Sequence, residues 1–467
     1  MERLRKLFEE WAGEPLQESL ALGGGGSSRR YYRLFGGTRS CIGTIADDLR
    51  ENEAFFAYSR HLRSKGMHVP EVYAIDSDRR HYIQEDLGDR SLYGILYEKK
   101  RNGGGFDAEM LDLYKQALSD LNDIQKAGRD MDFNVAFPRA DFDRRSMMWD
   151  LNYFKYYFVK LSHVPFDEEL LENDFEALCD FLLQTDTSYF MYRDFQGRNI
   201  LVGDCMNYID YQGGRRGAAQ YDVASLLYSA KSDLPETIRQ ELLRHYVALH
   251  GDADFMTHFW GYVLIRIMQT LGAYGFRGYY ERKPYFLESI PLALANLRHV
   301  TESHLLPICL PELERVWRAL ANMQKPEEAS DGRLTVSVRS FSYKRGIPED
   351  TSGNGGGHVF DCRALPNPGR YAEYKNYTGK DRPVIDYLRR EPAVDFFLDH
   401  AKAIVAQSVD KYHERHFTHL SVNFGCTGGQ HRSVYCTEQM GEWLRQTYPD
   451  VNVQVEHTVF PNQRNSR

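Results

Sequence analysis

The chain has no apolar run near the ~20 residues that a membrane-spanning helix needs. Its first segment, Met1 to Glu10, alternates charged and apolar side chains and contains no signal-peptide core. Seven cysteines are scattered without a CxxC pair or a histidine at ligand spacing, so neither a zinc site nor a disulfide framework is indicated. These absences predict a protein of the reducing cytoplasm with no membrane partner.

The net charge is −8, which gives no global reason to expect a nucleic-acid partner. A length of 467 residues suggests two to four domains, each large enough to bury its own core. Hydrophobic residues make up 42% of the chain and charged residues 27%, proportions typical of a folded protein rather than a disordered one.

The most informative segment is Tyr192-Arg193-Asp194-Phe195-Gln196-Gly197-Arg198-Asn199, followed by Tyr208-Ile209-Asp210-Tyr211. It predicts a loop that enters one strand at Asn199 and a second strand, Asn207 to Tyr211, that carries Asp210. In phosphotransferases of this layout the first Asp accepts the proton of the acceptor hydroxyl, while the Asn and the later Asp hold Mg²⁺ against nucleotide phosphates. The alternative is a solvated hairpin with acidic ends.

These patterns assign Asp194 as general base and Asn199 and Asp210 as Mg²⁺ ligands. Arg198 pairs either with a phosphate or with a nearby acid, and we include it among the catalytic residues. Asp222 is expected to cap a helix and brace the catalytic loop.

Residues 23–28, Gly-Gly-Gly-Gly-Ser-Ser, form either a flexible linker or a turn that covers phosphates. The flanking segments 29–35 and 39–46 alternate like strands, which favours the turn, because its backbone N–H groups can lie over phosphates. The segment Gln84-Glu85-Asp86-Leu87 lies where the connection between lobes should face adenine. The predicted nucleotide-binding residues are therefore Gly25, Gly26, Ser27, Ser28, Arg29, Glu85 and Leu87.

The pattern along the chain predicts a small β-rich lobe over residues 1–90, with a helix at 48–65 and strands at 72–75 and 82–85. Residues 91–322 are mostly helical. A polar, turn-rich linker covers 323–332. Residues 333–467 predict a separate α/β domain, with strands at 334–341, 359–363, 420–425 and 451–457 and helices at 394–413 and 433–448.

Six segments carry a resemblance to known kinases: 25–33, 192–201, 209–212, 217–227, 269–274 and 283–285. On these motifs residues 1–320 resemble the aminoglycoside-phosphotransferase-like kinases, and most closely the branch that phosphorylates N-acetylmuramate or N-acetylglucosamine at C1. The resemblance implies a protein-kinase-like bilobal fold, ATP and Mg²⁺ as cofactors, a sugar substrate, and a role in cell-wall recycling.

Two departures from the kinase pattern matter. The usual histidine of the catalytic loop is Tyr192, a change expected to affect packing more than chemistry. No lysine lies between Lys6 and Lys65, so the strand lysine that normally pairs with the α- and β-phosphates is absent. The anomeric-kinase branch also lacks it. Three arginines could supply the missing charge, Arg29, Arg30 and Arg33, although solvated strand arginines are the simpler interpretation. A catalytically inert kinase fold is the alternative.

The segment Gly425-Cys426-Thr427-Gly428-Gly429-Gln430-His431-Arg432-Ser433 is predicted between a strand and a helix, where small residues let backbone N–H groups converge on an anion. His431 and Arg432 would add charge-assisted hydrogen bonds. Cys426 and Arg432 also satisfy C-x₅-R-S, the pattern of a Cys-dependent phosphatase, in which a thiolate attacks phosphate.

Residues 333–458 resemble the C-terminal domain of the RapZ family of RNase adapter proteins. The resemblance rests on segments 340–344, 359–368 and 378–381 and on the 425–433 loop. It implies binding of an amino-sugar phosphate through Asp361, Arg363, Asn367, Thr427, Gly428, His431 and Arg432. Asp361 and Arg363 are expected on the same side of one strand. The predicted effector is glucosamine-6-phosphate or a related metabolite.

RNA is the less favoured partner of this domain. No GxxxxGK[ST] motif of the RapZ partner domain occurs, and Thr458 stands where an Arg is expected. The tail 460–467 offers only Arg464 and Arg467, although phosphate contacts normally need clustered cations. The sequence therefore predicts an ATP-dependent amino-sugar kinase with a sugar-phosphate-binding regulatory domain. The alternative is an inert kinase fold that acts as an RNA or protein adapter.

Overall fold

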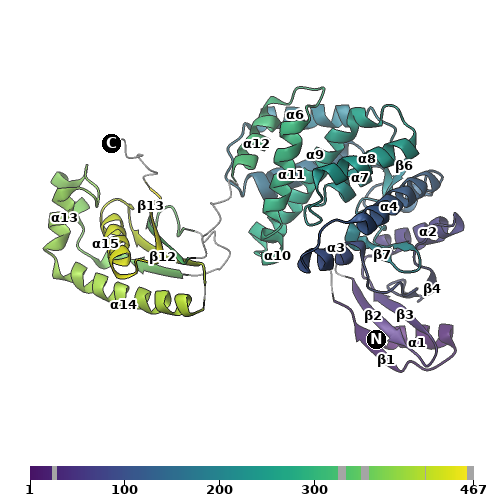
Figure 1. Ribbon diagram of the computed structural model, residues 1–467, viewed down its shortest axis with the longest axis horizontal. Coiled ribbons are helices and arrows are strands. Elements are labelled where there is room, and N and C mark those ends of the chain that lie inside the picture. The colour runs from purple at the N-terminus through teal and green to yellow at the C-terminus, as the bar shows by residue number, and fades with distance from the viewer. Residues whose placement is uncertain (24–28, 324–332, 349–356, 416, 460–467) are drawn as a thin grey trace. The chain divides into compact units, whose positions relative to one another are not determined.

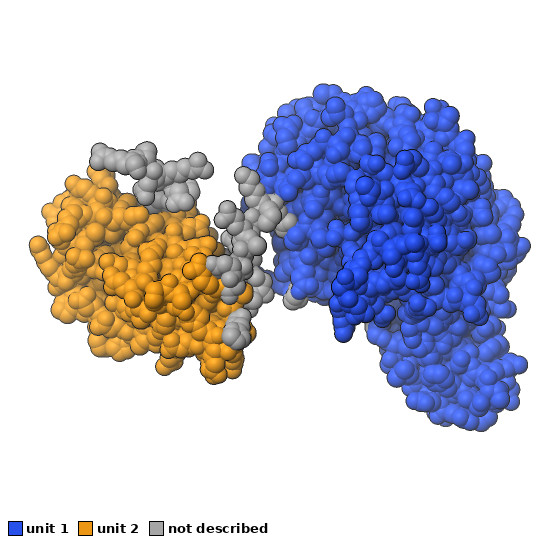
Figure 2. Space-filling model, in the orientation of Figure 1, with its two compact units in different colours: residues 1–325 blue, residues 326–467 orange. Residues whose placement is uncertain are grey.

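The computed structural model describes residues 1–23, 29–323, 333–348, 357–415 and 417–459 (Figure 1). The chain forms two compact units, residues 1–325 and 326–467, coloured separately in Figure 2. The linker expected at residues 323–332 lies outside the described residues except for Met323.

The first unit begins with a five-stranded antiparallel sheet in the order β1-β2-β3-β5-β4. The strands are β1 (Glu18–Ala21), β2 (Arg30–Phe35), β3 (Ser40–Ile45), β4 (Val72–Ile75) and β5 (His81–Gln84). Helix α1 (Glu2–Ala12), which the sequence patterns did not predict, packs Leu4 and Phe8 onto this sheet in a cluster with Leu34 and Ile83. The β-rich lobe expected at the N-terminus is confirmed, and the purple end of Figure 1 shows it.

Helix α2 (Leu49–Ser64) follows the third strand, as expected. It starts after Asp48, whose side chain accepts the backbone N–H of Arg50 at 3.0 Å and so satisfies a free donor at the helix start. Its buried face carries Phe55, Phe56 and Leu62 into the main core. Glu51, one turn before Phe55 on the same side of the helix, lies beside the cleft described below.

The rest of this unit is helical, which confirms the expected second lobe. Its helices are α3 (Leu92–Arg101), α4 (Ala108–Ala127), α5 (Arg144–Phe154), α6 (Glu168–Leu182), α7 (Ala219–Leu227), α8 (Glu236–His250), α9 (Phe255–Tyr274), α10 (Pro284–Leu287), α11 (Ile290–Ser303) and α12 (Pro311–Asn322). Helix α9 is apolar on most of its surface and packs against α5, α7 and α11, so it forms the centre of the lobe.

Two short antiparallel strand pairs are embedded among the helices and carry the catalytic segment. β6 (Tyr189–Met191) pairs with β9 (Arg215–Gly217), and β7 (Ile200–Val202) pairs with β8 (Met206–Tyr208). The second strand of the predicted hairpin therefore ends at Tyr208 rather than Tyr211. Asp210 lies beyond it with φ at +72°. The backbone N–H of Ile209 donates to the carbonyl of Asn199, so the pairing extends one residue past the strand, directly before Asp210.

The second unit is a four-stranded parallel sheet in the order β11-β12-β10-β13. Its strands are β10 (Thr335–Ser342), β11 (Gly357–Asp361), β12 (His419–Cys426) and β13 (Asn452–His457), and its helices are α13 (Arg382–Arg389), α14 (Pro392–Glu414) and α15 (Arg432–Thr447). The second strand, expected at residues 359–363, was predicted to include Arg363, and this is wrong. The strand ends at Asp361, whose side chain accepts the N–H of Arg363 at 2.8 Å and starts a 3₁₀ turn.

All four strands are parallel, so their carboxyl ends share one edge of the sheet. Ser342 lies opposite Cys426, and Asp361 lies opposite Gly425. The separate α/β domain is thus confirmed. In the described part of the chain no helix is long and apolar enough to cross a bilayer.

Candidate functional site

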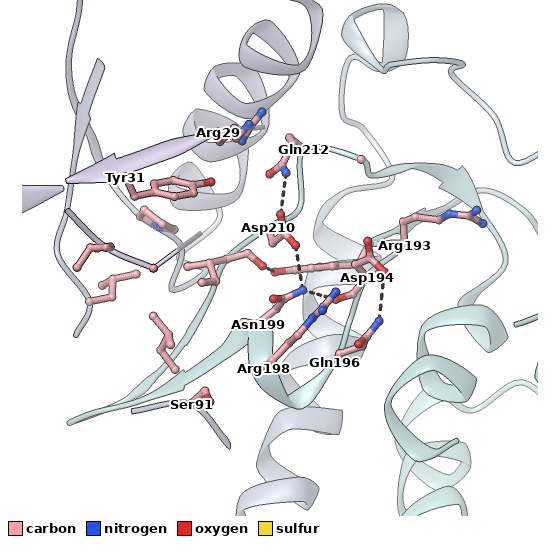
Figure 3. A pocket seen from close by; sticks show the side chains of 18 of the residues that line it. Arg29, Tyr31, Ser91, Arg193, Asp194, Gln196, Arg198, Asn199, Asp210 and Gln212 are labelled. Atoms are coloured by element: carbon pink, nitrogen blue, oxygen red, sulfur yellow. Dashed lines mark hydrogen bonds between the residues drawn. The ribbon is translucent and has the colours of Figure 1, made fainter. Parts of the chain in front are cut away.

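Asp194, Asn199 and Asp210 converge in a cleft of about 1400 Å³ in the first unit (Figure 3). The amide nitrogen of Asn199 donates to the main-chain oxygen of Asp194 at 2.9 Å and to Oδ2 of Asp210 at 3.2 Å. The β7–β8 hairpin positions this group, because it returns the chain from Asn199 to Asp210. The carboxylate of Asp210 and the carboxamide of Asn199 therefore contact each other beside Asp194.

Asp194 is the most accessible acid of this centre, with 44% of its side chain exposed. Its Oδ1 accepts from Gln196 at 3.2 Å and lies 3.4 Å from Nη2 of Arg266. Arg266 is buried on α9 and is held by the hydroxyl groups of Ser225 at 3.0 Å and Thr270 at 2.9 Å. A fixed guanidinium thus orients a carboxylate that still faces the cleft.

Asn199 and Asp210 offer the oxygen ligands that Mg²⁺ prefers. Both contacts of Asn199 use its amide nitrogen, so Oδ1 is the atom that can coordinate a cation. Burial and the nearby Asp194 carboxylate raise the pKa of Asp210. A bound cation would relieve both effects, because it stabilises the ionised carboxylate. The donor set therefore fits a divalent ion.

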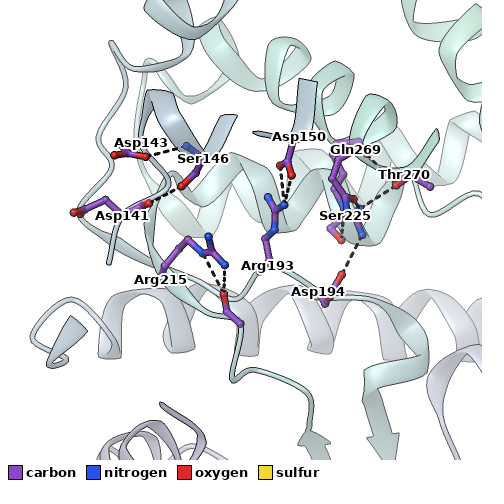
Figure 4. A network of polar contacts seen from close by, with 12 residues as sticks. Asp141, Asp143, Ser146, Asp150, Arg193, Asp194, Arg215, Ser225, Gln269 and Thr270 are labelled. Carbon is purple, nitrogen blue, oxygen red and sulfur yellow. Dashed lines mark hydrogen bonds and ion pairs between the residues drawn. The ribbon is translucent and has the colours of Figure 1, made fainter. Parts of the chain in front are cut away.

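The loop that carries Asp194 is held by two acids from different helices. Asp222 of α7 is fully buried and accepts the N–H groups of Tyr192 at 2.7 Å and Arg193 at 2.9 Å. Asp150 of α5 accepts both of its bonds from Nη2 of Arg193 at 2.7 Å (Figure 4). Asp222 therefore braces the loop, but it does not cap α7, whose first residue follows Ala218.

Tyr192, in the place of the usual histidine, links the two halves of the centre. It is 1% exposed, and its hydroxyl donates to the carbonyl of Ile209 at 2.5 Å. Ile209 directly precedes Asp210, so Tyr192 ties the loop of Asp194 to the loop of Asp210. This role is structural, in agreement with the expectation that tyrosine in place of histidine affects packing more than chemistry.

The structure separates the three arginines considered as substitutes for the missing lysine. Arg33 forms ion pairs with Asp86 and Asp89 at the connection between lobes, at 2.6 Å and 2.8 Å. Arg30 is exposed on β2. Arg29 is only 4% exposed in its side chain, lines the cleft, and lies 3.3 Å from Glu51 of α2. An Arg–Glu pair thus links the start of β2 to α2, whereas protein kinases pair a lysine of the third strand with a glutamate of a helix.

The other residues predicted to bind the nucleotide fall into two groups, those that line the cleft and those outside the described chain. Glu85 and Leu87 line the cleft, and the Glu85 carboxylate is 3.1 Å from Arg63. Arg198 is exposed into the same cleft and stabilises the ionised form of Asp210. Four residues lie outside the described part of the chain: Gly25, Gly26, Ser27 and Ser28.

The side of the cleft beyond Asp194 mixes aromatic and polar groups. Tyr274, Tyr285 and Phe286 contribute rings, and the Tyr274 and Phe286 centroids are 5.9 Å apart. Gln269 on α9 and Arg277 add polar groups. Aromatic surfaces with few polar groups are typical of small-molecule sites. This side can accept a compact polar molecule next to the base.

In the second unit, the predicted anion-binding residues gather at the carboxyl edge of the parallel sheet, where α/β sheets commonly bind ligands. Asp361 ends β11, and Arg363, two residues later, forms a bidentate ion pair with it, closest at 2.6 Å. The Arg363 guanidinium also lies 4.0 Å from the Tyr343 ring centroid. Thr427 and Gly428 are exposed after β12. These four predicted residues present polar groups to solvent on neighbouring strands.

The other three predicted ligands are occupied by contacts within the protein. Arg432 is 5% exposed and donates to the carbonyls of Arg363 at 2.8 Å and Leu365 at 3.0 Å. His431 contacts the carbonyl of Tyr374 at 3.0 Å, and the Asn367 side chain accepts from Gly369. They shape the loop and its neighbours.

Cys426 does not form the centre of a phosphatase. It is 3% exposed. Burial opposes its ionisation, but hydrogen bonds from Ser433 and the N–H of Gly429 outweigh burial and lower its pKa. Its sulfur faces these internal donors, and Arg432 holds backbone carbonyls. A nucleophile needs access to phosphate, which this arrangement does not give.

Three residues of the kinase-like centre had no signal in the sequence patterns: Glu51, Asp150 and Arg266. Each lies apart from its partner in the chain, and Glu51 and Asp150 sit on helices with ordinary surface patterning. Only the fold brings them to the catalytic segment. A search for single charged residues on otherwise apolar helices would have found Arg266, because α9 is buried around it.

Comparisons with known proteins agree with this architecture. The model of the phosphotransferase enzyme family matches residues 19–256, and the model of the RapZ C-terminal domain matches residues 334–460. The first match spans half of the chain, so the chain belongs to the phosphotransferase enzyme family. It carries a RapZ C-terminal domain in addition.

Curated relatives are similar over shorter stretches. A nucleotide-binding protein of Marinobacter nauticus is 37% identical over 139 residues, which are 30% of this chain and 45% of that protein. One from an Acidovorax species is 44% identical over 116 residues, 24% of this chain and 39% of that protein. The chain therefore spans less than half the length of these relatives.

Solved structures show a remote likeness. Ethanolamine kinase of Plasmodium vivax has 12% identity and a TM-score of 0.44, covering 61% of this chain and 82% of the kinase. The GDP complex of aminoglycoside 2'-phosphotransferase-IIIa has 13% identity and a TM-score of 0.44, covering 62% and 96%. Likeness at this level implies neither a substrate nor a reaction for this chain.

Proposed function

We propose that the first unit is an ATP-dependent sugar kinase that phosphorylates the anomeric hydroxyl of an amino sugar of the N-acetylmuramate or N-acetylglucosamine type. The observation that carries the proposal is the convergence of Asp194, Asn199 and Asp210 in one cleft between the β-rich lobe and the helices. Membership of the phosphotransferase enzyme family supports the reaction class. The sequence resemblance supports the choice of sugar.

Asp194 is the general base in this proposal. Its carboxylate faces the cleft, and Gln196 and Arg266 fix its orientation. It accepts the proton of the sugar hydroxyl as the oxygen attacks the γ-phosphorus, and the bond from that phosphorus to the bridging oxygen of ADP breaks. Base catalysis of this kind contributes about 10²–10⁴ in rate.

Asn199 and Asp210 are the groups that would hold Mg²⁺ against the nucleotide. The ion supplies charge that stabilises the phosphates and the leaving group. Tyr192 keeps these ligands in register with Asp194, because its hydroxyl binds the carbonyl before Asp210. Most of the catalysis then comes from positioning and electrostatics.

Three arginine side chains bind the phosphates. Arg29, held by Glu51, takes the place of the missing lysine at the α- and β-phosphates. Arg198 and Arg266 flank the base and lie on the side of the transferred group. Glu85 and Leu87 border the adenine end of the cleft through the connection between lobes.

The aromatic and polar side of the cleft holds the sugar. Ring faces such as those of Tyr274 and Phe286 suit the C–H surface of a pyranose, and Gln269 and Arg277 can bind its hydroxyl or carboxyl groups.

The test is a substrate screen. The full chain is incubated with ATP, Mg²⁺ and free hexosamines, N-acetylmuramate or heptoses, and ADP release is measured. Phosphorus NMR then locates the new phosphate. We expect sugar-dependent ADP release and a phosphate on C1. Phosphate on another hydroxyl would keep the kinase and overturn the anomeric assignment. ADP release that no sugar stimulates would favour the inert-adapter alternative.

For the second unit we propose binding of an amino-sugar phosphate at the carboxyl edge of its sheet. The support is the position of Asp361, Arg363, Thr427 and Gly428 on neighbouring strand ends. Arg363 would bind the phosphate, and Asp361 the sugar amine or hydroxyl groups. Arg432 and His431 act by holding the loop.

Calorimetric titration with glucosamine-6-phosphate tests this second proposal. Arg363→Met should weaken binding by about 10- to 150-fold, the value of a hydrogen bond to a charged group. Glucosamine without phosphate serves as the ligand control, and Arg345→Met, which changes another exposed arginine of the same unit, as the variant control. If Arg363→Met binds glucosamine-6-phosphate with unchanged affinity, the sugar phosphate does not bind at Arg363.

A further inference from the structure

A second group of metal-ligating side chains lies in the helical lobe, on elements separate from the catalytic loop. Glu236 is the first residue of α8, His299 lies near the end of α11, and His304 directly follows that helix. One ligand atom from each lies within 4.8 Å of the other two. Glu236 lies far from the two histidines in the sequence, which is why no three-ligand spacing was visible there.

The closest pair in this group does not behave like an ordinary ion pair. Nε2 of His299 lies 3.0 Å from Oε2 of Glu236, yet both atoms are buried and neither makes a hydrogen bond. An N–H donor aimed at the carboxylate would satisfy both atoms. The geometry fits two lone pairs directed toward a common point instead. Buried polar atoms without partners call for an explanation.

The spacing suits a zinc ion. Zn–N and Zn–O distances of about 2.0–2.1 Å place tetrahedral ligand atoms roughly 3.3 Å apart. The observed 3.0 Å is close to this, and the ligand atom of His304 lies within 4.8 Å of the other two. Two imidazoles favour Zn²⁺ over Mg²⁺ or Ca²⁺, which prefer oxygen ligands.

Neighbouring side chains hold the ligands in position. Gln240 donates to Oε1 of Glu236 at 3.3 Å, and Arg239 lies 3.7 Å from Oε2. Arg239 is the competing cation, but its shorter contact, 2.8 Å, is to Asn296. The His304 ring stacks on Trp260 with centroids 3.4 Å apart, which fixes its plane.

The comparable group Asp76, Asp78 and His81 lacks these features. Arg3 lies 2.7 Å from Asp76 and 3.1 Å from Asp78, and Asp78 contacts His81 at 2.8 Å. Its carboxylates are already paired, so it carries no proposal and serves as a control.

We propose that Glu236, His299 and His304 form a zinc site with an open position for water. The ion would join the start of α8 to the end of α11. The loop before α8 contributes Tyr228, Ser229 and Ala230 to the cleft, so the site supports one wall of it. The proposal is independent of the kinase assignment, because it requires only the helical lobe.

The first test uses Zn²⁺ alone and chelator-treated full-length protein, in a Cys205→Ser/Cys309→Ser background that removes the two exposed thiols. We expect one Zn²⁺ per chain by calorimetry and elemental analysis. His299→Ala should weaken binding by more than about 10-fold, since even outer-shell changes cost that much. His81→Ala should bind like the parent. A parent protein that binds no Zn²⁺, or a His299→Ala protein that binds it equally, would overturn the site.

The second test does not depend on removing a ligand. Co²⁺ in a site of two imidazoles and one carboxylate gives visible absorption, and the paramagnetic ion quenches a nearby indole. Trp260, stacked on His304, is the built-in reporter. We expect saturable quenching that Trp260→Phe abolishes while Co²⁺ binding persists. Glu236→Gln, which keeps the shape of the side chain, should weaken both signals. Quenching unchanged in Trp260→Phe would place the ion elsewhere and refute the assignment.

Discussion

Replacing Arg29 by methionine removes one guanidinium from the cleft and keeps an unbranched side chain of comparable reach. The arginine is 4% exposed, whereas its partner Glu51 is 39% exposed, so water can solvate the carboxylate that the substitution leaves unpaired. The aliphatic part would remain near Phe55, whose ring centroid is 6.0 Å from the guanidinium carbon. We therefore expect a folded protein whose defect is confined to phosphate binding.

The size of the defect follows from the type of bond. A hydrogen bond to a charged group contributes about 1.5–3 kcal/mol, and about 1.4 kcal/mol is a tenfold change in affinity. Loss of Arg29 should therefore weaken ADP and ATP binding by about 10- to 150-fold. Adenosine, which has no phosphate, should bind as before. The comparison of the two ligands isolates the phosphate contact from any change in the adenine pocket.

Calorimetric titrations with adenosine, ADP and ATP measure these affinities, and thermal unfolding checks the fold. The matched control is Arg30→Met, which removes the same charge from the next residue of β2, where the side chain is exposed. It should bind all three ligands normally. Equal losses for adenosine and ADP in Arg29→Met, or no loss for either, would refute the role of Arg29 as the substitute for lysine.

Three further predictions concern the catalytic loop. Asp194→Asn keeps the shape of the side chain and should lower kcat by about 10²–10⁴ without changing the affinity for ADP. A much smaller fall in kcat would refute the role of Asp194 as the base. Arg266→Gln should lower kcat more than it raises KM for ATP, and the opposite split would make it a nucleotide-binding residue. Burial raises the pKa of Asp222 to about 7, so kcat should fall below that pH as the carboxylate protonates and its bonds to the loop weaken. Because the folded-state pKa lies above the ordinary 3.8, this group stabilises the fold at low pH, and that contribution is lost as pH rises from 3.8 through about 7. Asp222→Asn should flatten both profiles, which rate measurements and thermal unfolding across pH will show.

Short-range geometry explains what the sequence could predict. Asp194, Asn199 and Asp210 lie within one loop and hairpin, so their spacing alone brings them together. The alternating strands of both units and helices α2, α14 and α15 follow from the period of their apolar residues. Each of these features depends on neighbours in the chain.

Long-range packing and side-chain-to-backbone bonds explain what it could not predict. Glu51 and Arg266 reach the centre only because α2 and α9 pack beside it, and no local pattern encodes that approach. Strand β11 was expected to continue to Arg363, but the Asp361 carboxylate captures the Arg363 N–H and ends it. As a result, the two side chains pair across a turn and do not extend from one face of a strand.

The catalytic loop holds two residues in backbone conformations that side chains rarely adopt, Arg193 at φ +80° and Asp210 at φ +72°. Each costs of the order of 1–3 kcal/mol and persists only where surrounding contacts determine it. Here those contacts come from three sources: Asp150 on the Arg193 side chain, Asp222 on the loop N–H groups, and Tyr192 on the carbonyl before Asp210. The strain therefore lies beside Asp194, the proposed base, and at Asp210, a proposed cation ligand. Such an arrangement sets the positions of the reacting groups before substrate binds, which is what a reaction catalysed mainly by positioning requires.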